Sequence, residues 1–369
     1  MRLVASGVLS RSVPGTDRAC LTFPAVAALS DGTLLATLRA GDEKDSAREG
    51  IEVYRSGDGG MTWSGPTFPF SAPVIDGHAG SLKLCYVTEL APGHLLAAAM
   101  WVDRTLYPGE PLFNARTEGC LPMAILLSNS EDNGATWSAW RQVPMPGEIG
   151  PPSLTSPVMK LADGRLAMSI ETNKPYLDGS KWLQRAVFLH SGDGGANWSA
   201  PTTVAQDPEG RIFNWDLRCG VAPDGRVVSF AWTYDSQTTT YLNIHRRVSA
   251  DGGLTWTDAE DIGVADQAAR PSILSNGGLV LAWVDRFGSR SIRARHAADV
   301  AAPLGEEVVV YAHPQPEAAS ADTGEMLASM GMWNFGLPSA TALPDGDALV
   351  VYYAGETGAL DIRWARLRP

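Results

Sequence analysis

The chain has 369 residues, of which 44% are hydrophobic and 19% are charged, a composition that is ordinary for a globular protein. Its 29 basic and 41 acidic residues give a formal net charge of −12, which disfavours nucleic acid and anionic membranes as partners. The four cysteines, Cys20, Cys85, Cys120 and Cys219, include no close pair, so neither a disulfide framework nor a zinc site is expected.

Targeting signals are sparse. No stretch approaches 18 uninterrupted apolar residues, so the sequence predicts no membrane span. The first ten residues lack the long apolar region of a signal peptide. A cytoplasmic location is therefore expected, and secretion is the alternative if a leader has been removed.

One short pattern, Ser-x-Asp-x-Gly-x-x-Trp, recurs four times along the chain. Its copies are Ser56–Trp63, Ser130–Trp137, Ser191–Trp198 and Ser249–Trp256. The Asp side chain can accept hydrogen bonds from nearby backbone N–H groups and Gly accepts positive φ, so each copy predicts a tight turn between two strands. The Trp is expected to pack that turn against its own sheet.

A second kind of turn alternates with the first. Its six copies are Asp31-Gly32, Pro92-Gly93, Asp163-Gly164, Asp224-Gly225, Asn276-Gly277 and Asp345-Gly346. Each lies between two short apolar runs and predicts a β-hairpin. The first four units contain both turns and therefore four strands. The last two keep their strands, around Ser291–His296 and Asp361–Leu367, without the Trp motif.

Six four-stranded units predict an all-β fold, a six-bladed β-propeller formed by a single domain over residues 1–369. The expected blades are 17–70, 77–147, 153–207, 213–264, 269–313, and 333–369 completed by 1–12. The N-terminal run Arg2–Leu9 is expected to supply the last strand and close the ring, which hides its edges. Residues Gln315–Ala328 are expected to form a loop or a short helical insertion.

Both kinds of turn are predicted to lie on one rim, so the aspartates of the Trp motif are expected to be structural. Ligand chemistry is expected at the opposite rim, where loops of all blades converge on a central funnel. The residues predicted there combine carboxylates, arginines and aromatics. Paired carboxylates can divide acid and base roles, arginines bind carboxylate or sulfate bidentately, and aromatic faces stack on sugar rings. The funnel therefore predicts a carbohydrate ligand, favouring an acidic one.

On these motifs the chain resembles, over nearly its whole length, the sialidase (neuraminidase) superfamily with its Asp-box repeats. The resemblance implies the propeller fold but does not fix the substrate. Thr22 stands where the family has the Arg of its Arg-Ile-Pro element, and Thr233-Tyr234 lies near the family's second Arg. Arg290 resembles the third, and Leu337 stands where the nucleophilic Tyr is expected. Sialic acid cleavage by the family mechanism is therefore not expected.

Three carboxylates are the candidate catalytic residues. By the resemblance, Asp45 matches the family's general acid by spacing, although Asp42 is an equal alternative, and Asp216 matches the Glu that supports the nucleophile. Glu171 ends an apolar run. Asp216, between apolar neighbours, needs a partner and is expected to have a shifted pKa; a structural salt bridge to Arg218 is the alternative. We expect Asp45 to act as acid and Asp216 or Glu171 as base or nucleophile.

Further residues are predicted to contact the substrate. They are Arg39, His78, Arg218, Arg270, Asp285, Arg286, Arg290, Trp333 and Tyr353. Four of them have a structural alternative: His78 is either an acid or base near neutral pH or a polar surface residue, Asp285 and Arg286 either bind substrate or pair with each other, and Trp333 is either a sugar platform or interblade packing.

The sequence thus favours a sialidase-like glycoside hydrolase, exo-acting on an acidic or uronate-containing glycan, and not a typical sialidase. A related possibility is an exo-arabinanase-like enzyme. The alternatives from other classes are a non-catalytic carbohydrate-binding propeller and a polysaccharide lyase with His78, Tyr234 or Tyr353 as base. No cofactor and no metal site are implied, since the sequence has neither an HExxH motif nor paired cysteines.

Overall fold

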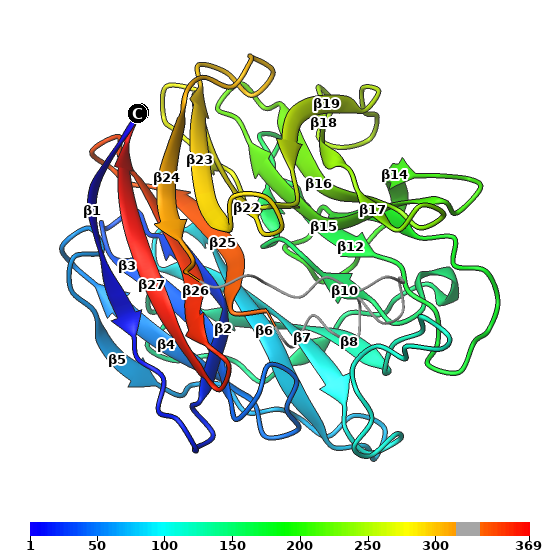
Figure 1. The fold of residues 1–369 in the computed structure, drawn as a ribbon. Coiled ribbons are helices and arrows are strands. Elements are labelled where there is room, and N and C mark those ends of the chain that lie inside the picture. Colours follow the sequence, from blue (N-terminus) through cyan, green and yellow to red (C-terminus); the bar gives the residue numbers. More distant parts are fainter. Residues whose placement is uncertain (315–332) are drawn as a thin grey trace.

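The computed structural model describes residues 1–314 and 333–369. Its strands form sheets that follow one another around a central axis (Figure 1). The described residues contain one short 3-10 helix, η1 (Gly147–Ile149), and none of their helices is long and apolar enough to cross a membrane. The loop or insertion expected over Gln315–Ala328 lies outside the described residues.

Each blade begins with its innermost strand, nearest the axis. The first consists of β2 (Cys20–Ala28), β3 (Leu34–Gly41), β4 (Gly50–Ser56) and β5 (Ser64–Thr67). The second consists of β6 (Gly80–Ala91), β7 (His94–Asp103), β8 (Met123–Ser130) and β9 (Arg141–Gln142). The third consists of β10 (Ser153–Leu154) and β11 (Met159–Lys160), then β12 (Leu166–Glu171), β13 (Arg185–Ser191) and β14 (Thr202–Gln206).

The remaining blades follow the same plan. The fourth consists of β15 (Ile212–Val221), β16 (Val227–Asp235), β17 (Thr240–Tyr241), β18 (Asn243–Ser249) and β19 (Glu260–Ala265). The fifth consists of β20 (Gln267–Ala268), β21 (Ser272–Ile273), β22 (Leu279–Asp285), β23 (Ser291–Ala297) and β24 (Glu307–Ala312). The sixth consists of β25 (Phe335–Ala342), β26 (Ala348–Glu356) and β27 (Ala359–Arg368).

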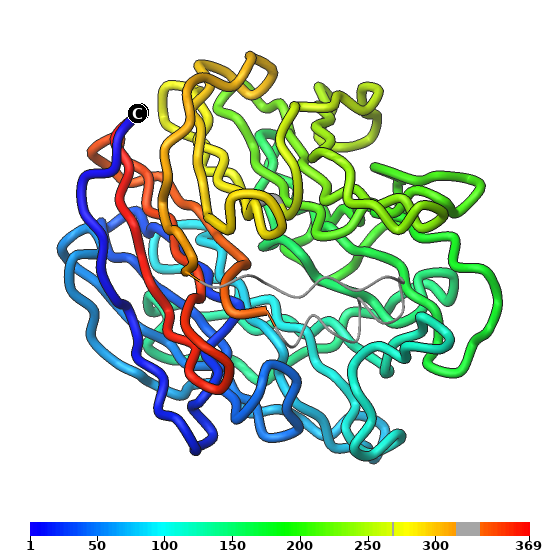
Figure 2. The backbone as a smooth tube through the Cα atoms, viewed as in Figure 1, coloured from blue at the N-terminus to red at the C-terminus, as the bar shows by residue number. Residues whose placement is uncertain are grey.

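The N-terminal strand completes the sixth blade. β1 (Arg2–Ser10) pairs antiparallel with β27, from Arg2 opposite Arg368 to Ser10 opposite Ile362, and the blue and red ends of the tube run side by side in Figure 2. A single parallel pair between Cys20 and Leu360 joins this blade to the first. The predicted six-bladed propeller closed by its N-terminal strand is confirmed.

The predicted turns have the expected geometry. The six hairpin glycines have φ between 81° and 89°. In the first Trp motif, the Gly60 N–H donates to Ser56 Oγ at 2.9 Å, the Thr62 N–H donates to Asp58 Oδ1 at 2.9 Å, and Trp63 Nε1 donates to the Gly60 carbonyl at 3.0 Å. The other three motifs repeat these bonds.

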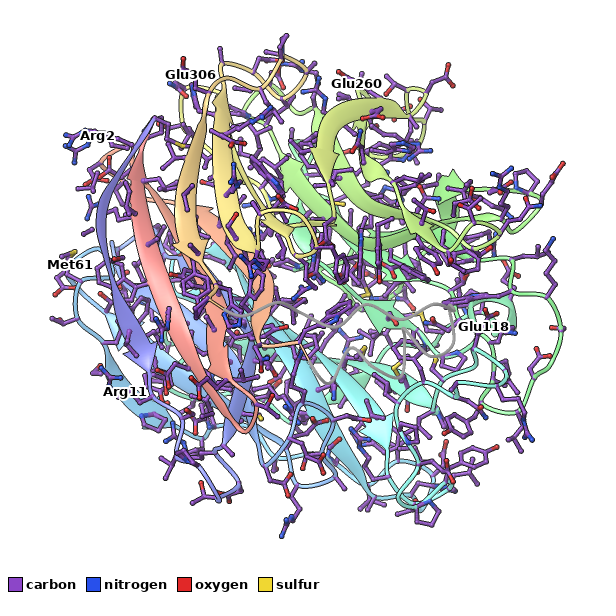
Figure 3. The ribbon with its side chains drawn as sticks, viewed as in Figure 1. Arg2, Arg11, Met61, Glu118, Glu260 and Glu306 are labelled. Atoms are coloured by element: carbon purple, nitrogen blue, oxygen red, sulfur yellow. The ribbon has the colours of Figure 1, made fainter. Side chains whose placement is uncertain are left out.

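The central strands are buried on both faces because neighbouring blades cover them. All eight residues of β3 and all nine of β16 are buried. The side chains of Arg2, Met61 and Glu260 are exposed and lie at the periphery in Figure 3.

Three innermost strands are interrupted by a bulge. Their register shifts between Thr22 and Ala25, between Trp215 and Arg218, and between Gly336 and Ser339. The bulges hold Phe23, Asp216 and Leu337 at φ of 49°, 49° and 45°. Positive φ costs a non-glycine residue about 1–3 kcal/mol and is concentrated at functional sites.

Candidate functional site

A cavity of about 210 Å³ lies where the blades converge. Residues from all six blades line it, among them the three bulge residues Phe23, Asp216 and Leu337. The strained backbone of the innermost strands therefore directs side chains into this cavity. Among the described residues, no cluster of His, Cys, Asp and Glu could hold a metal ion.

Glu171 and Asp216 form a carboxyl pair on the cavity wall. Glu171 ends β12, and its Oε1 accepts the Leu217 N–H at 2.8 Å. Because Leu217 directly follows Asp216, this bond brings the two carboxyl groups next to each other. Asp216 Oδ1 accepts from Arg218 Nη2 at 3.1 Å, and its Oδ2 accepts from Gln267 Nε2.

The environment of Glu171 favours its protonated form. Burial raises the pKa of this carboxyl, and the negative charge of Asp216 raises it further, to about 8. The Leu217 N–H and Arg218 act in the opposite direction but are weaker. Glu171 therefore carries a proton at neutral pH that it can donate to a ligand in the cavity.

Asp45 has the opposite environment. Burial alone would raise its pKa, but Lys83 and Arg104 hold the pKa of this carboxyl well below its usual range. Its Oδ1 accepts from Lys83 Nζ at 2.8 Å and Arg104 Nη2 at 2.6 Å, and its Oδ2 accepts the Leu112 N–H at 2.7 Å. Asp45 is thus ionised at neutral pH and has no proton to give.

A buried network of ion pairs holds the two cations that bind Asp45. Glu49, whose side chain is fully buried, pairs with Arg39, with Lys83 at 3.4 Å and with Arg104 at 2.9 Å. These contacts join the first blade to the second. They also fix the two cations that bind Asp45, so its position depends on Lys83 and Arg104 of the second blade.

Four indoles form the aromatic wall of the cavity. They belong to Trp182, Trp215, Trp232 and Trp333. The ring centroids of Trp215 and Trp232 are 5.7 Å apart, and those of Trp232 and Trp333 are 5.8 Å apart. Within residues 1–314 and 333–369, the indole N–H groups of Trp215 and Trp232 have no hydrogen-bond partner. Such a wall suits the apolar face of a sugar ring.

Sequence comparisons identify no relative: no family model matches the chain, and neither does any curated protein. Solved structures do match. One is a protein of unknown function from Dyadobacter fermentans, with a TM-score of 0.76, 20% identity, and coverage of 100% of this chain and 98% of that chain.

Two further matches are enzymes. The intramolecular trans-sialidase from Ruminococcus gnavus, solved with oseltamivir carboxylate, has a TM-score of 0.67 at 15% identity over 100% of this chain and 98% of that chain. The Trypanosoma rangeli sialidase, solved with the inhibitor DANA, has a TM-score of 0.66 at 12% identity over 99% of this chain and 60% of that chain. The chain has a sialidase-like propeller fold. Identities this low establish the fold alone.

On this sialidase-like fold, two positions that differ from the family pattern lie near the axis. Thr22 is fully buried, and its Oγ1 accepts a long 3.4 Å hydrogen bond from Arg39. Leu337 lines the cavity with an apolar side chain. Neither side chain offers the guanidinium or the phenol that the resemblance implies at these positions.

Half of the predicted site residues line the cavity. They are Asp45, Glu171, Asp216, Arg218, Trp333 and Tyr353. Tyr353 Oη accepts from Lys44 Nζ at 2.9 Å, and Lys44 also lines the cavity.

The other predicted residues lie outside its lining. Arg39 is buried in its pair with Glu49, and His78 pairs with Asp103 at 2.8 Å. Asp285 accepts the N–H groups of Gly288 and Ser289, so it caps a turn. Arg286 is buried with its guanidinium 4.1 Å from the Trp333 ring centroid, Arg290 is exposed, and Arg270 lines a second, smaller cavity.

The sequence-based list omitted several lining residues, namely Tyr86, Lys83, Trp182, Trp232 and Gln267. Lys83 carried a usable signal, because it is the one charge within the apolar run Leu82–Val87 and a buried lysine requires partners. Gln267 carried none, since nothing in its neighbourhood indicates that it contacts Asp216 from a different blade.

Proposed function

We propose that the protein is a glycoside hydrolase that removes a terminal sugar, with Glu171 as general acid and Asp216 as the second catalytic carboxylate. One observation carries the proposal: a protonated carboxyl lies next to a carboxylate that accepts two hydrogen bonds, in one aromatic-walled cavity. Glycosidases divide acid and nucleophile or base roles between two such groups.

The roles follow from the surroundings of each group. Glu171 would protonate the leaving-group oxygen, because its buried carboxyl keeps the proton at neutral pH. Asp216 would stabilise or attack the oxocarbenium-like centre, because Arg218 and Gln267 orient both of its oxygens. The sialidase-type tyrosine nucleophile has no counterpart at Leu337, so a carboxylate takes its place in this proposal.

The acid role moves from Asp45, where the sequence resemblance placed it, to Glu171. Asp45 is held ionised by Lys83 and Arg104, so it suits hydrogen bonding to a substrate hydroxyl. Its oxygens line the same cavity as the carboxyl pair, and a bound sugar would be oriented by Asp45 on one side and by the aromatic wall on the other.

The proposed substrate class is a carbohydrate that carries an acidic group, such as a uronate. Lys44, Lys83 and Arg218 bring three cationic side chains to the cavity lining, and Lys44 is partly exposed there. The trans-sialidase and sialidase of similar fold were solved with oseltamivir carboxylate and DANA. An acidic glycan is therefore the first class to test.

A hydrolysis screen tests the proposal with aryl glycosides and acidic oligosaccharides. We expect the wild type to release a reducing sugar, Glu171→Gln to lose this activity, and Glu148→Gln to retain it. Glu148 is the matched control because its side chain is 60% exposed and outside the cavity lining.

Three outcomes would overturn the proposal. Turnover that survives in Glu171→Gln would show that Glu171 is not the general acid. An unsaturated uronate product would identify a lyase, and saturable sugar binding without any turnover would identify a carbohydrate-binding propeller.

A further inference from the structure

A second, much smaller cavity of about 10 Å³ lies close to the first. The two share four lining residues, Phe23, Tyr86, Arg218 and Leu337. A volume of this size holds a single particle as large as a water molecule. The second cavity is therefore a one-atom site that adjoins the larger cavity.

Arg270 brings an uncompensated positive charge to this cavity. Across the described part of the chain it makes no salt bridge, and its one hydrogen bond runs from Nη1 to the Val26 carbonyl at a long 3.5 Å. Burial lowers the pKa of its guanidinium, which expresses the cost of keeping this charge away from water. Arg270 is half-buried, and a partly desolvated cation without a counterion is destabilising unless something neutralises it.

Further donors belong to the same cavity. Tyr86 Oη accepts from Arg218 Nη1 at 3.2 Å, so its own O–H proton is available to another acceptor. Burial raises the pKa of Tyr86, which keeps that proton in place. Arg218 Nε has no partner within the described residues. Arg218, Arg270 and Tyr86 therefore line one small space, which Ser339 also lines.

The rest of the lining excludes a cation. It contains no carboxylate, and three of its members are the prolines Pro24, Pro157 and Pro338, which lack a backbone N–H. A carboxylate or phosphate group has several heavy atoms and exceeds a one-atom space. We propose that this cavity binds a chloride ion between Arg218 and Arg270.

Bound chloride would act on both stability and the neighbouring site. An anion that binds only the folded state stabilises it by mass action. It would also share Arg218 with Asp216, which that arginine contacts at 3.1 Å. The anion site is independent of the proposed hydrolase activity, because neither its binding nor its detection requires turnover.

Diffraction from bromide-soaked crystals is the direct test. Crystals of the wild type grown without halide and then soaked in sodium bromide are expected to show an anomalous peak between the Arg218 and Arg270 guanidiniums. Water alone at that position, with no anomalous peak, would overturn the proposal.

Thermal unfolding provides the solution test. At constant ionic strength, replacing gluconate by chloride is expected to raise the melting temperature by about 3 °C once chloride reaches about 100 times its Kd. Arg270→Gln should abolish this shift, and Arg290→Gln, at an exposed arginine, should keep it.

A chloride shift that survives in Arg270→Gln would contradict the site. If that variant does not fold, Tyr86→Phe replaces it. Loss of one donor should raise the chloride Kd, measured from the melting temperatures, about tenfold. An unchanged Kd would also contradict the site.

Discussion

The aspartates of the Trp motifs and Glu171 in the cavity have opposite environments within one ring. Hydrogen bonds from Thr62, Thr136 and Asn197 lower the pKa of Asp58, Asp132 and Asp193 to about 2. Burial raises the pKa of Glu171 to about 8. The motif carboxylates are exposed and satisfied by their own turns, whereas Glu171 is buried and keeps its proton.

The distance along the chain to each partner explains the difference. Thr62 lies four residues from Asp58. Leu217 lies 46 residues from Glu171, and Gln267 lies 51 residues from Asp216. A carboxylate whose hydrogen-bond donors lie within a few residues stabilises its own turn. Glu171 and Asp216 acquire their donors from other blades only when the ring has assembled. Activity should therefore respond to Glu171 and Asp216 and not to the motif aspartates.

Glu171→Gln is expected to have the largest effect on activity. Loss of the general acid should lower kcat by about 10²–10⁴-fold, and the wild-type rate should fall as pH rises through about 8, where Glu171 loses its proton. Steady-state kinetics from pH 5 to 9 measure both. A wild-type profile with no decline on the basic side would argue against Glu171 as the acid.

The same substitution should change how stability depends on pH. The unfolded carboxyl releases its proton near its ordinary pKa of 4.5 and the folded one near 8, so the folded state binds more protons between these values and loses stability as pH rises through them. Glu171→Gln removes this loss. The melting temperature of Glu171→Gln should therefore rise relative to that of the wild type from pH 5 to pH 8. A difference between the two melting temperatures that stays constant over this range would contradict the raised pKa.

Asp45→Asn is expected to destabilise the protein by about 1–3 kcal/mol. The change leaves Lys83 and Arg104, both largely buried, with one carboxylate partner fewer. Urea unfolding measures the loss. The fall in rate near pH 8 should be the same in Asp45→Asn as in the wild type. If this fall disappears in the variant, Asp45 and not Glu171 is the general acid.

Gln267→Met should lower kcat about 10–100-fold with little change in KM. The substitution keeps the volume of a buried side chain but removes the amide that donates to Asp216 Oδ2. Gln237→Met, at an exposed position, is the control. Equal kinetics in the two variants would show that Asp216 does not need this contact.

Asp251→Ala should have the smallest effect, a loss of about 1 kcal/mol of stability with unchanged activity. Its carboxylate accepts the N–H groups of Leu254 and Thr255, and its pKa is lowered to about 2. The contribution should be present above pH 4 and fade as pH falls towards 2. Measurable loss of activity at neutral pH would contradict a purely structural role for the motif aspartates.

The difference between local partners and partners from other blades also decided what the sequence could predict. The ring and its closing strand followed from turn chemistry, which lies within a few neighbouring residues, as at Gly32 and Asp58. Glu171 and Asp216 could be selected because each is a charge beside apolar strand residues. The roles could not be assigned, because Asp45 obtains its cations from the second blade and Asp216 obtains Gln267 from the fifth. Arg290 could not be placed either, since its loop ends at a positive φ of 54° and leaves the side chain exposed.

The pairing of β1 with β27 has a consequence during synthesis. The ribosome makes Arg2–Ser10 before the partner of this strand, Ala359–Arg368, which emerges about 350 residues later, roughly 20–70 s at ordinary rates of translation. For that interval the nascent chain carries an unpaired edge strand, with Leu3 and Val4 exposed even in the finished ring. A circular permutant that moves β1 behind β27 would make these partners neighbours in time as well as in space, and it should aggregate less while it is being made.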